Sequence, residues 1–336
     1  MKKLHTKSPC CHASVQRFGI RRRRCAQCHA TWRIRKKKRG RKLLRADHAL
    51  ARAYLDKAVP SVRLLAHQYH CGKDRIHILL VRSLAAYVAE EETRWSRALP
   101  DTSRLIAVAD AIWYHVGKEF YTIYIILLRP VASTDAVICP PVVLVGREDL
   151  AGWKQAFASL PPALEKRVIA LVCDGATSLV ALARSRRWIL QRCHFHLIAA
   201  VQNYLTTGQR SPHRAYALSV LRTVQGLLAT NQPLKVGRFR AALRDIRRQS
   251  KSRGLRRVLS GFLKTHSDYH AYLRYPELNL PTTSNAAESC IQCIRDLMYR
   301  CRGFRSYTSL ILWLTAFALH KKIIRCNGKK STKLNQ

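Results

Sequence analysis

The stretch that decides the fold runs from Arg167 to Leu197 and reads RVIALVCDGATSLVALARSRRWILQRCHFHL. Within it, Val168–Cys173 is a short apolar run rich in β-branched residues, which predicts a strand buried on both faces. The run ends at Asp174, followed by Gly175, and open α/β sheets place reactive groups at such a strand end. An Asp-Gly pair is also common in ordinary turns, so Asp174 gains functional meaning only if other carboxylates join it.

The rest of this stretch continues the alternation of helix and strand. Thr177–Arg186 predicts a helix with Thr177 near its N-cap, and Trp188–Gln191 predicts a second strand. Cys193 and His196 follow that strand at once, with the spacing Cys-x-x-His. A functional role for this pair competes with a plainer one, because a buried thiol and a hydrogen-bonded histidine also serve as ordinary core residues.

The composition predicts a folded protein with a polyanionic partner. The chain has 336 residues, enough for two or three domains, and 48% of them are hydrophobic. Lysine and arginine total 61 against 19 acidic residues, which gives a formal net charge of +42. Because this excess spreads along the whole chain, double-stranded DNA fits the charge better as a partner than a membrane surface does.

The lengths of the apolar runs and the number of cysteines predict the cellular compartment of the protein. The chain has no apolar run of about 18 residues, and no apolar stretch follows its basic N-terminus, so neither a membrane span nor a secretory signal is predicted. Its 12 cysteines are then expected to be reduced thiols, some of them binding metal. We therefore expect a cytoplasmic protein.

Strand patterns also precede the central stretch. Arg104–Ile112 reads RLIAVADAI, a buried-strand pattern interrupted by Asp110. Phe120–Leu128 predicts a second strand, and Ala136–Val145 predicts a third, placed at a sheet edge because it contains two prolines. Asp149–Leu160 then predicts a helix. An unpaired carboxylate inside an apolar strand is costly, so Asp110 should need a cation.

Beyond the central stretch the pattern becomes helical. Ile198–Tyr275 shows helical periodicity with many basic residues, which predicts an α-helical insertion. Within it, the dense arginine and lysine series of Arg238–Arg257 suits either a solvated helix face or a face that follows DNA.

The C-terminal part contains a third acidic candidate. Residues 281–288 read PTTSNAAE, and either Ser284 or Asn285 is expected to cap a helix that runs to about Arg300. Glu288 falls in the first turn of that helix, where its charge suits the helix dipole even without any other role. Ser309–Ile324 predicts a final apolar helix, and residues 327–336 form a polar tail.

The N-terminal segment has the cysteine spacing of a zinc site. Cys25-Ala-Gln-Cys28 can place two thiolates on one tetrahedral zinc ion. Cys11 is a third candidate ligand, with either Cys10 or His12 as the fourth. The irregular first half of this pattern leaves a second interpretation open, in which the segment is a basic arm without metal.

Basic residues of the N-terminal third are candidates for DNA contact. Arg21, Arg22, Arg23 and Arg24 form a run that suits phosphate contacts. Farther along, Leu43–Lys57 predicts a helix, Ser61 can cap a second one over Val62–Tyr69, and Lys73–Glu90 predicts a third. The last two helices, joined by a short turn, fit a helix-turn-helix whose recognition helix begins at Lys73 and Arg75. An ordinary helical hairpin fits the pattern equally well.

Three carboxylates, Asp110, Asp174 and Glu288, would make sense as one site. Two carboxylates about 4 Å apart repel by about 4 kcal/mol at an effective dielectric constant near 20, and divalent cations offset that repulsion. Oxygen-only ligation favours Mg²⁺ or Mn²⁺ over zinc. A pair of such ions can activate water or a DNA 3′-hydroxyl for in-line displacement at phosphorus. In a basic chain, this chemistry points to cleavage and strand transfer of DNA.

The residues quoted above also resemble a known family. VADAIWYHV around Asp110, LVCDG around Asp174, the Cys193-x-x-His196 element, TTSNAAE ending at Glu288 and the following RCRGFRS are similar to motifs of bacterial insertion-sequence transposases. These are DDE transposases of the Mutator-like type, and the resemblance covers roughly residues 8–325. It implies a ribonuclease-H-like catalytic core with an α-helical insertion, preceded by a zinc-ribbon-like segment and a helix-turn-helix.

The resemblance implies roles for the candidate residues. Asp110, Asp174 and Glu288 would bind two Mg²⁺ or Mn²⁺ ions and catalyse DNA cleavage and strand transfer at terminal inverted repeats. The protein would act as a homo-oligomer on its DNA. The alternative is a catalytically inactive or domesticated relative that only binds DNA. The expected segments are 1–42 (zinc-ribbon-like), 43–98 (helix-turn-helix), 99–197 and 281–326 (core), 198–280 (insertion) and 327–336 (tail).

Overall fold

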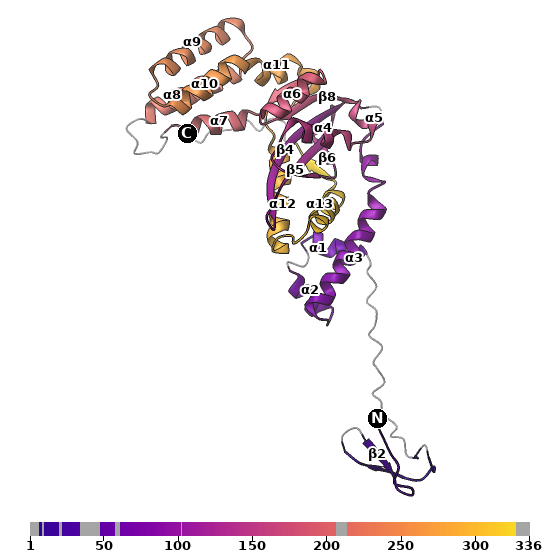
Figure 1. Ribbon diagram of the computed structural model, residues 1–336. Helices are drawn as coiled ribbons and strands as arrows, with labels where there is room; N and C mark the ends of the chain where they lie inside the picture. Colours follow the sequence, from indigo (N-terminus) through magenta and orange to yellow (C-terminus); the bar gives the residue numbers. More distant parts are fainter. Residues whose placement is uncertain are drawn as a thin grey trace. The chain divides into compact units, whose positions relative to one another are not determined.

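The computed structural model describes residues 7–8, 10–19, 22–33, 48–57, 61–101, 103–205 and 214–326 (Figure 1). Arg21, the basic run Lys36–Lys42 and the predicted tail 327–336 lie outside these residues. The chain divides into two compact units, Met1–Arg45 and Ala46–Gln336, which we describe separately. Among the helices in the described part of the chain, none is long and apolar enough to cross a membrane.

The first unit contains a small antiparallel sheet. Its strands follow in the order β1-β2-β3 and span Val15–Arg17, Arg22–Cys25 and Thr31–Arg33. The turn between β2 and β3 carries Cys28, and Cys10 and Cys11 lie in the turn before β1. So short a segment buries little apolar surface, so a bound metal would contribute much of its folding free energy.

The second unit is built on a mixed sheet, which confirms the predicted α/β class. Six of its strands follow in the order β10-β6-β5-β4-β8-β9, and β7 also pairs with β5. β4 is parallel to β8, β8 is parallel to β9, and the pairs on the other side of β4 are antiparallel. The strands span Leu105–Val116 (β4), Glu119–Pro130 (β5), Asp135–Ile138 (β6), Val142–Val145 (β7), Val168–Cys173 (β8), Ile189–Arg192 (β9) and Ile323–Arg325 (β10).

Two of the sequence predictions for this sheet were wrong. Ala136–Val145 is not one strand, because Pro140 and Pro141 interrupt it and the two halves pair separately with β5 as β6 and β7. The final helix also ends early, at Lys321, and the residues after it form the edge strand β10, which pairs with β6. Only the second error comes from a pairing partner that lies far away along the sequence.

Helices cover both faces of the sheet. Cross-strand neighbours share a face, and successive residues of a strand face opposite sides. Tyr124 of β5 packs its ring against Trp153 of α4, with 4.8 Å between the ring centroids. The next residue, Ile125, and its cross-strand partner Asp110 therefore face the other side, where α12 packs against β4 and β5. The helices near the sheet span Leu150–Ala158 (α4), Pro162–Glu165 (α5), Thr177–Ser185 (α6), Asn285–Cys301 (α12) and Tyr307–Lys321 (α13).

The helices before the sheet pack on the core of the same unit. They span His48–Leu55 (α1), Val62–Gln68 (α2) and Lys73–Glu91 (α3), and α3 contacts both α1 and α13. The hydroxyl of Ser61 accepts a hydrogen bond from the Leu64 N–H and caps α2, as predicted. At the start of α3, Lys73 is exposed and Arg75 is half-buried. The helix pair leaves both predicted interpretations, helix-turn-helix and helical hairpin, open.

The predicted α-helical insertion has a core of its own. It begins at His194, because α7 starts directly after β9 rather than at Ile198. The insertion helices lie side by side (Figure 1) and bury a separate apolar cluster that includes Val201, Val224 and Leu259. The helices span His194–Gln202 (α7), Arg214–Leu228 (α8), Pro233–Gln249 (α9), Arg253–Thr265 (α10) and Ala271–Arg274 (α11).

A buried arginine ties the sheet to the segment that leads into α12. Arg129 of β5 is only 1% exposed, and its guanidinium donates hydrogen bonds to the backbone carbonyls of Ser133, Leu278 and Asn279. Hydrogen bonds from a charged group are worth roughly 1.5–3 kcal/mol each, and an unpaired buried carbonyl is costly.

Replacing this arginine by an apolar residue of similar length should therefore destabilise the protein. We expect Arg129→Met to lower the free energy of unfolding by roughly 2–4 kcal/mol in urea titrations. The exposed Arg97 provides the control, and Arg97→Met should change the free energy of unfolding by less than about 0.5 kcal/mol. Equal effects of the two substitutions would contradict the role of Arg129.

Candidate functional site

Asp110 lies on β4, and Asp174 directly follows the neighbouring parallel strand β8. Val108 of β4 pairs with Val172 of β8, and each aspartate comes two residues after its member of this pair. Because side chains alternate along a strand, both carboxylates face the same side of the sheet. Neighbouring strands are about 4.8 Å apart, so the two side chains lie close together. Both strands were predicted from the sequence, but their pairing with each other was not.

A tight loop holds Asp174. Its Oδ1 accepts a hydrogen bond of 2.8 Å from the Ala176 N–H, and Gly175 adopts a φ of +96°, which a residue with a side chain rarely does. A Cβ at Gly175 would also collide with the guanidinium of Arg192. Helix α6 begins at Thr177, so Thr177 lies next to the N-cap as predicted, but Ala176 occupies the N-cap position and no side chain caps the helix.

Arg192 connects this loop to the helical insertion. Its guanidinium donates a hydrogen bond of 2.8 Å to the Thr265 hydroxyl and a longer one of 3.4 Å to the Gly175 carbonyl. It also lies 4.8 Å from the centre of the Tyr269 ring. Sequence reasoning missed Arg192, although its position directly after a predicted strand could have marked it.

Glu288 lies closest to the Cys-x-x-His element. The Sγ of Cys193, a ring nitrogen of His196 and a carboxylate oxygen of Glu288 all lie within 4.8 Å of one another. His196 Nδ1 is 3.6 Å from Glu288 Oε1. Within the described ranges, the tight groups of metal-binding side chains are this one and the four N-terminal cysteines. Glu288 therefore groups with Cys193 and His196 rather than with both aspartates.

Ser284 links these three residues. It stands at the N-cap position of α12 but makes no capping hydrogen bond with its side chain. Instead, its N–H donates to Cys193 Sγ at 3.3 Å, and its Oγ lies 3.5 Å from both His196 Nδ1 and Glu288 Oε1. The predicted capping function of Ser284 is thus replaced by contacts inside the site, which a single sequence does not reveal.

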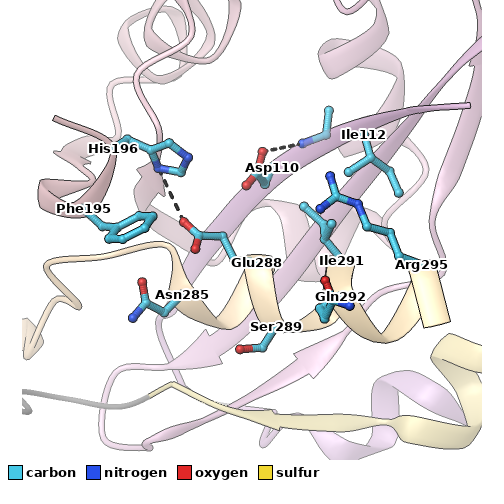
Figure 2. A pocket seen from close by; sticks show the side chains of 11 residues that line it. Asp110, Ile112, Phe195, His196, Asn285, Glu288, Ser289, Ile291, Gln292 and Arg295 are labelled. Atoms are coloured by element: carbon cyan, nitrogen blue, oxygen red, sulfur yellow. Dashed lines mark hydrogen bonds and ion pairs between the residues drawn. The ribbon is translucent and has the colours of Figure 1, made fainter. Parts of the chain in front are cut away.

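One of the two aspartates, Asp110, meets His196 and Glu288 at an open pocket (Figure 2). Its volume is about 680 Å³, and its lining includes Asp110, His196 and Glu288. The side chains of these three residues point toward one another in Figure 2, and the exposed ring of Phe195 borders the same space. A pocket of this size lined by acidic and aromatic groups can admit a nucleotide unit or hydrated cations.

The charges of the site are strongly coupled. Burial and the neighbouring charge of Asp174 raise the pKa of Asp110 to about 6, although the Ala111 N–H donates to its carboxylate. A hydrogen bond with Cys193 and the charges of Glu288 and Asp174 raise the pKa of His196 to about 9. Burial opposes ionisation of the Cys193 thiol, but hydrogen bonds with His196 and Ser284 lower its pKa overall. The hydrogen bond between Cys193 and His196 thus shifts the pKa of each residue toward its charged form.

Cys290 and Cys293 do not join this group. Their spacing, three residues apart on the helix that carries Glu288, would suit a second metal site with Cys193 and His196. Cys290 is instead buried in the main core, where desolvation raises the pKa of its thiol to about 12. Both residues thus behave as packed cysteines, the commoner role.

The N-terminal cysteines come together as a separate cluster. The sulfur atoms of Cys10, Cys11, Cys25 and Cys28 all lie within 4.8 Å of one another, so Cys10 rather than His12 completes the set. A tetrahedral site with Zn–S bonds of about 2.3 Å requires sulfurs about 3.8 Å apart, so the cluster is compatible with zinc. A hydrogen bond with Ser8 lowers the pKa of Cys25 to about 6. A hydrogen bond with Cys28 raises the pKa of Cys11 to about 12.

The predicted DNA-contacting arginines of this unit lie on β2. Arg22 is exposed, while Arg23 and Arg24 are half-buried, and Arg24 lies over the ring of Phe18 at 5.6 Å. Arg21, the fourth predicted residue, falls outside the described residues. Contact of these residues with DNA stays a prediction.

No protein-family model matches this chain, and a search of curated proteins found no match either. The interpretation of the site therefore depends on its own geometry and chemistry.

The cysteine cluster predicts that metal holds the first unit together. We expect Cys28→Ser to remove amide hydrogen-exchange protection from β1, β2 and β3, because one zinc ligand is lost. A chelator should do the same to the unaltered protein. Cys71, in the turn after α2, provides the control, and Cys71→Ser should leave the protection intact. Protection that survives both Cys28→Ser and the chelator would exclude a structural metal.

The raised pKa of Asp110 predicts a pH-dependent stability. Its folded-state value of about 6 exceeds the ordinary 3.8, so the folded protein loses stability as pH rises from 4 through 6 and the carboxyl ionises. Asp110→Asn avoids this cost. In chelator, we expect it to raise the free energy of unfolding by roughly 1–3 kcal/mol at pH 8, with the gain vanishing near pH 4.

The exposed Asp101 provides the matched control, because Asp101→Asn should have little effect at either pH. If Asp110→Asn raises the free energy of unfolding equally at pH 4 and pH 8, ionisation of Asp110 is not the cause of the gain.

Proposed function

We propose that this chain is a DDE-type DNA transposase, which cuts DNA at element ends and joins the 3′ ends to a target. The observation that carries the proposal is the pairing of β4 with β8, which brings Asp110 close to Asp174 at the end of β8, together with the pocket that Asp110 and Glu288 both line. The rest of the sequence is strongly basic, and the chain has a formal net charge of +42. A cation-binding acidic site within a basic protein suits chemistry on a polyanion such as DNA.

The strand arrangement supports a ribonuclease-H-like core. In the order β6-β5-β4-β8-β9, the central β4 is antiparallel to β5 and parallel to β8, as expected for that fold. The helical insertion lies between β9 and the helix that carries Glu288. This is where the family resemblance predicts an insertion. The three-stranded N-terminal sheet with its four cysteines likewise supports a zinc-ribbon-like segment.

The aspartates fit hard divalent cations. Asp110 is a mostly buried carboxylate next to a second carboxylate, and burial together with this repulsion raises its pKa. Oxygen donors of this kind prefer Mg²⁺ or Mn²⁺. When bound by Asp110, Asp174 and Glu288, a pair of such ions would lower the pKa of an attacking water and stabilise the leaving oxygen.

Glu288 would need to turn toward the aspartates in the active complex. Its carboxylate now contacts His196 and Ser284, and the three acidic residues form no tight group. Rotation about its side-chain bonds can move the carboxylate across the pocket without a change in α12. The entry of DNA and cations supplies a reason for such a rotation, because cations attract the carboxylate.

The chain's basic surfaces would position the DNA. Exposed arginine and lysine side chains occur along α9 and α10, at Lys235, Arg238, Arg244, Arg248, Arg253, Arg256 and Arg257. Phosphate contacts of this type fix the register of DNA without reading its sequence. Cleavage would then break a P–O3′ bond, leaving a 3′-hydroxyl and a 5′-phosphate. In strand transfer, that 3′-hydroxyl would attack a target phosphodiester and release a target 3′-hydroxyl.

One observation favours a second candidate, a DNA-binding protein without catalysis. Glu288 groups with a thiol and an imidazole instead of both aspartates. If that arrangement is permanent, the carboxylates cannot share cations and only DNA binding remains.

Cleavage of DNA that carries the element ends separates the two candidates. With Mg²⁺ present, we expect the protein to nick at the ends, and Asp174→Asn to reduce nicking to background while end binding in gel-shift assays is retained. The exposed Asp135 supplies the control, because Asp135→Asn should cut normally. End binding without Mg²⁺-dependent cutting by the unaltered protein would favour the second candidate, and cutting by Asp174→Asn would reject the site.

A further inference from the structure

Cys193, His196 and Glu288 are brought together by the backbone around them. The Cys193 N–H donates to the Cys173 carbonyl at 2.8 Å, which fixes the end of β9 against β8. The N–H of His194 donates to the Thr282 carbonyl at 2.8 Å, which holds the start of α7 against the segment before α12. Two helix starts that carry the ligand residues therefore meet at a fixed position.

The donor set differs from that of the two aspartates. It combines one thiol, one imidazole and one carboxylate, with ligand atoms within 4.8 Å of one another. Zn–N and Zn–O bonds of about 2.0–2.2 Å place tetrahedral ligands about 3.4 Å apart. The observed 3.6 Å between His196 Nδ1 and Glu288 Oε1 is close to that spacing. A sulfur ligand selects zinc or a similar transition metal and disfavours Mg²⁺.

We propose that Cys193, His196 and Glu288 form a zinc-binding site, distinct in its metal preference from the paired aspartates. Three protein ligands leave a fourth position, and His196 and Glu288 line the open pocket, so water or an oxygen of DNA can occupy it. The site is separate from the N-terminal cysteine cluster, which belongs to the other compact unit.

Ser284 supports this site from outside. Its N–H donates to Cys193 Sγ, which stabilises a thiolate ligand, and its hydroxyl lies against both other ligands. Such outer contacts orient metal ligands, and their loss typically weakens metal binding by about 10–100-fold.

Zinc at this site would also control Glu288. A carboxylate bound to zinc beside His196 cannot at the same time reach the cations of Asp110 and Asp174. Zinc therefore inhibits Mg²⁺-dependent cleavage, and this consequence, unlike the binding itself, rests on the proposed function.

Metal binding can be tested without DNA. In the full-length chain carrying Cys25→Ser and Cys28→Ser, the N-terminal cluster is disabled and the proposed site remains. We expect one zinc ion per chain to remain after dialysis, and Co²⁺ to give the near-ultraviolet absorption of a cobalt–thiolate bond. Adding Cys193→Ser should abolish both signals. Glu288→Gln, which changes a partly exposed side chain, should weaken zinc binding at least about tenfold.

Cys293, on the same helix as Glu288, provides the matched control, and Cys293→Ser should keep both signals. Absence of zinc from the parent chain, or binding that persists in both Cys193→Ser and Glu288→Gln, would overturn the proposal. If Cys193→Ser fails to fold, Glu288→Gln decides the matter alone.

The inhibitory consequence has its own readout. We expect micromolar free zinc to lower Mg²⁺-dependent nicking at least tenfold, and the ratio of activity with and without zinc to approach one in Cys193→Ser. A ratio near one in the unaltered protein would reject inhibition. If the unaltered protein does not cut DNA even without zinc, the proposed function fails. The number of zinc ions bound per chain still tests the zinc site in that case.

Discussion

The parallel pairing of β4 with β8 is the constraint on which the acidic site depends. It brings Asp110, on β4, close to Asp174, which directly follows β8 and lies 64 positions later in the sequence (174 − 110). Most apolar residues of both strands are buried, so the pairing is held by the core itself. Burial of Asp110, together with the neighbouring charge of Asp174, raises the pKa of Asp110. A dication can offset the cost of ionising Asp110, which links the fold to cation chemistry.

Much of this fold could be predicted from local patterns. The buried strands around Asp110 and Asp174 are apolar and β-branched, and the change to helical periodicity marked the insertion. The N-terminal cysteines were also recognisable, because Cys-x-x-Cys spacing reflects local geometry. Predictions held where the residues that decide a structure lie close together in the sequence.

Long-range partners could not be predicted in the same way. β10 pairs with β6, which lies nearly 190 positions earlier in the sequence (323 − 137 = 186). The three residues of β10 show no pattern that predicts an edge strand. Ser284 looked like a helix cap, yet it contacts three side chains of the site. The grouping of Glu288 with Cys193 and His196 likewise depends on how α7 and α12 meet. The resulting pocket is lined by Asp110, His196 and Glu288, which come from three separate parts of the chain.

The central claim is that Asp110 and Asp174 bind a hard divalent cation together. Electron paramagnetic resonance of Mn²⁺ titrated into the full-length chain tests it most directly, because bound and free Mn²⁺ give different signals. The account predicts bound Mn²⁺ in the unaltered protein, and its loss in Asp110→Asn and in Asp174→Asn. Mn²⁺ bound equally by the unaltered protein and both variants, or by none of them, would contradict it.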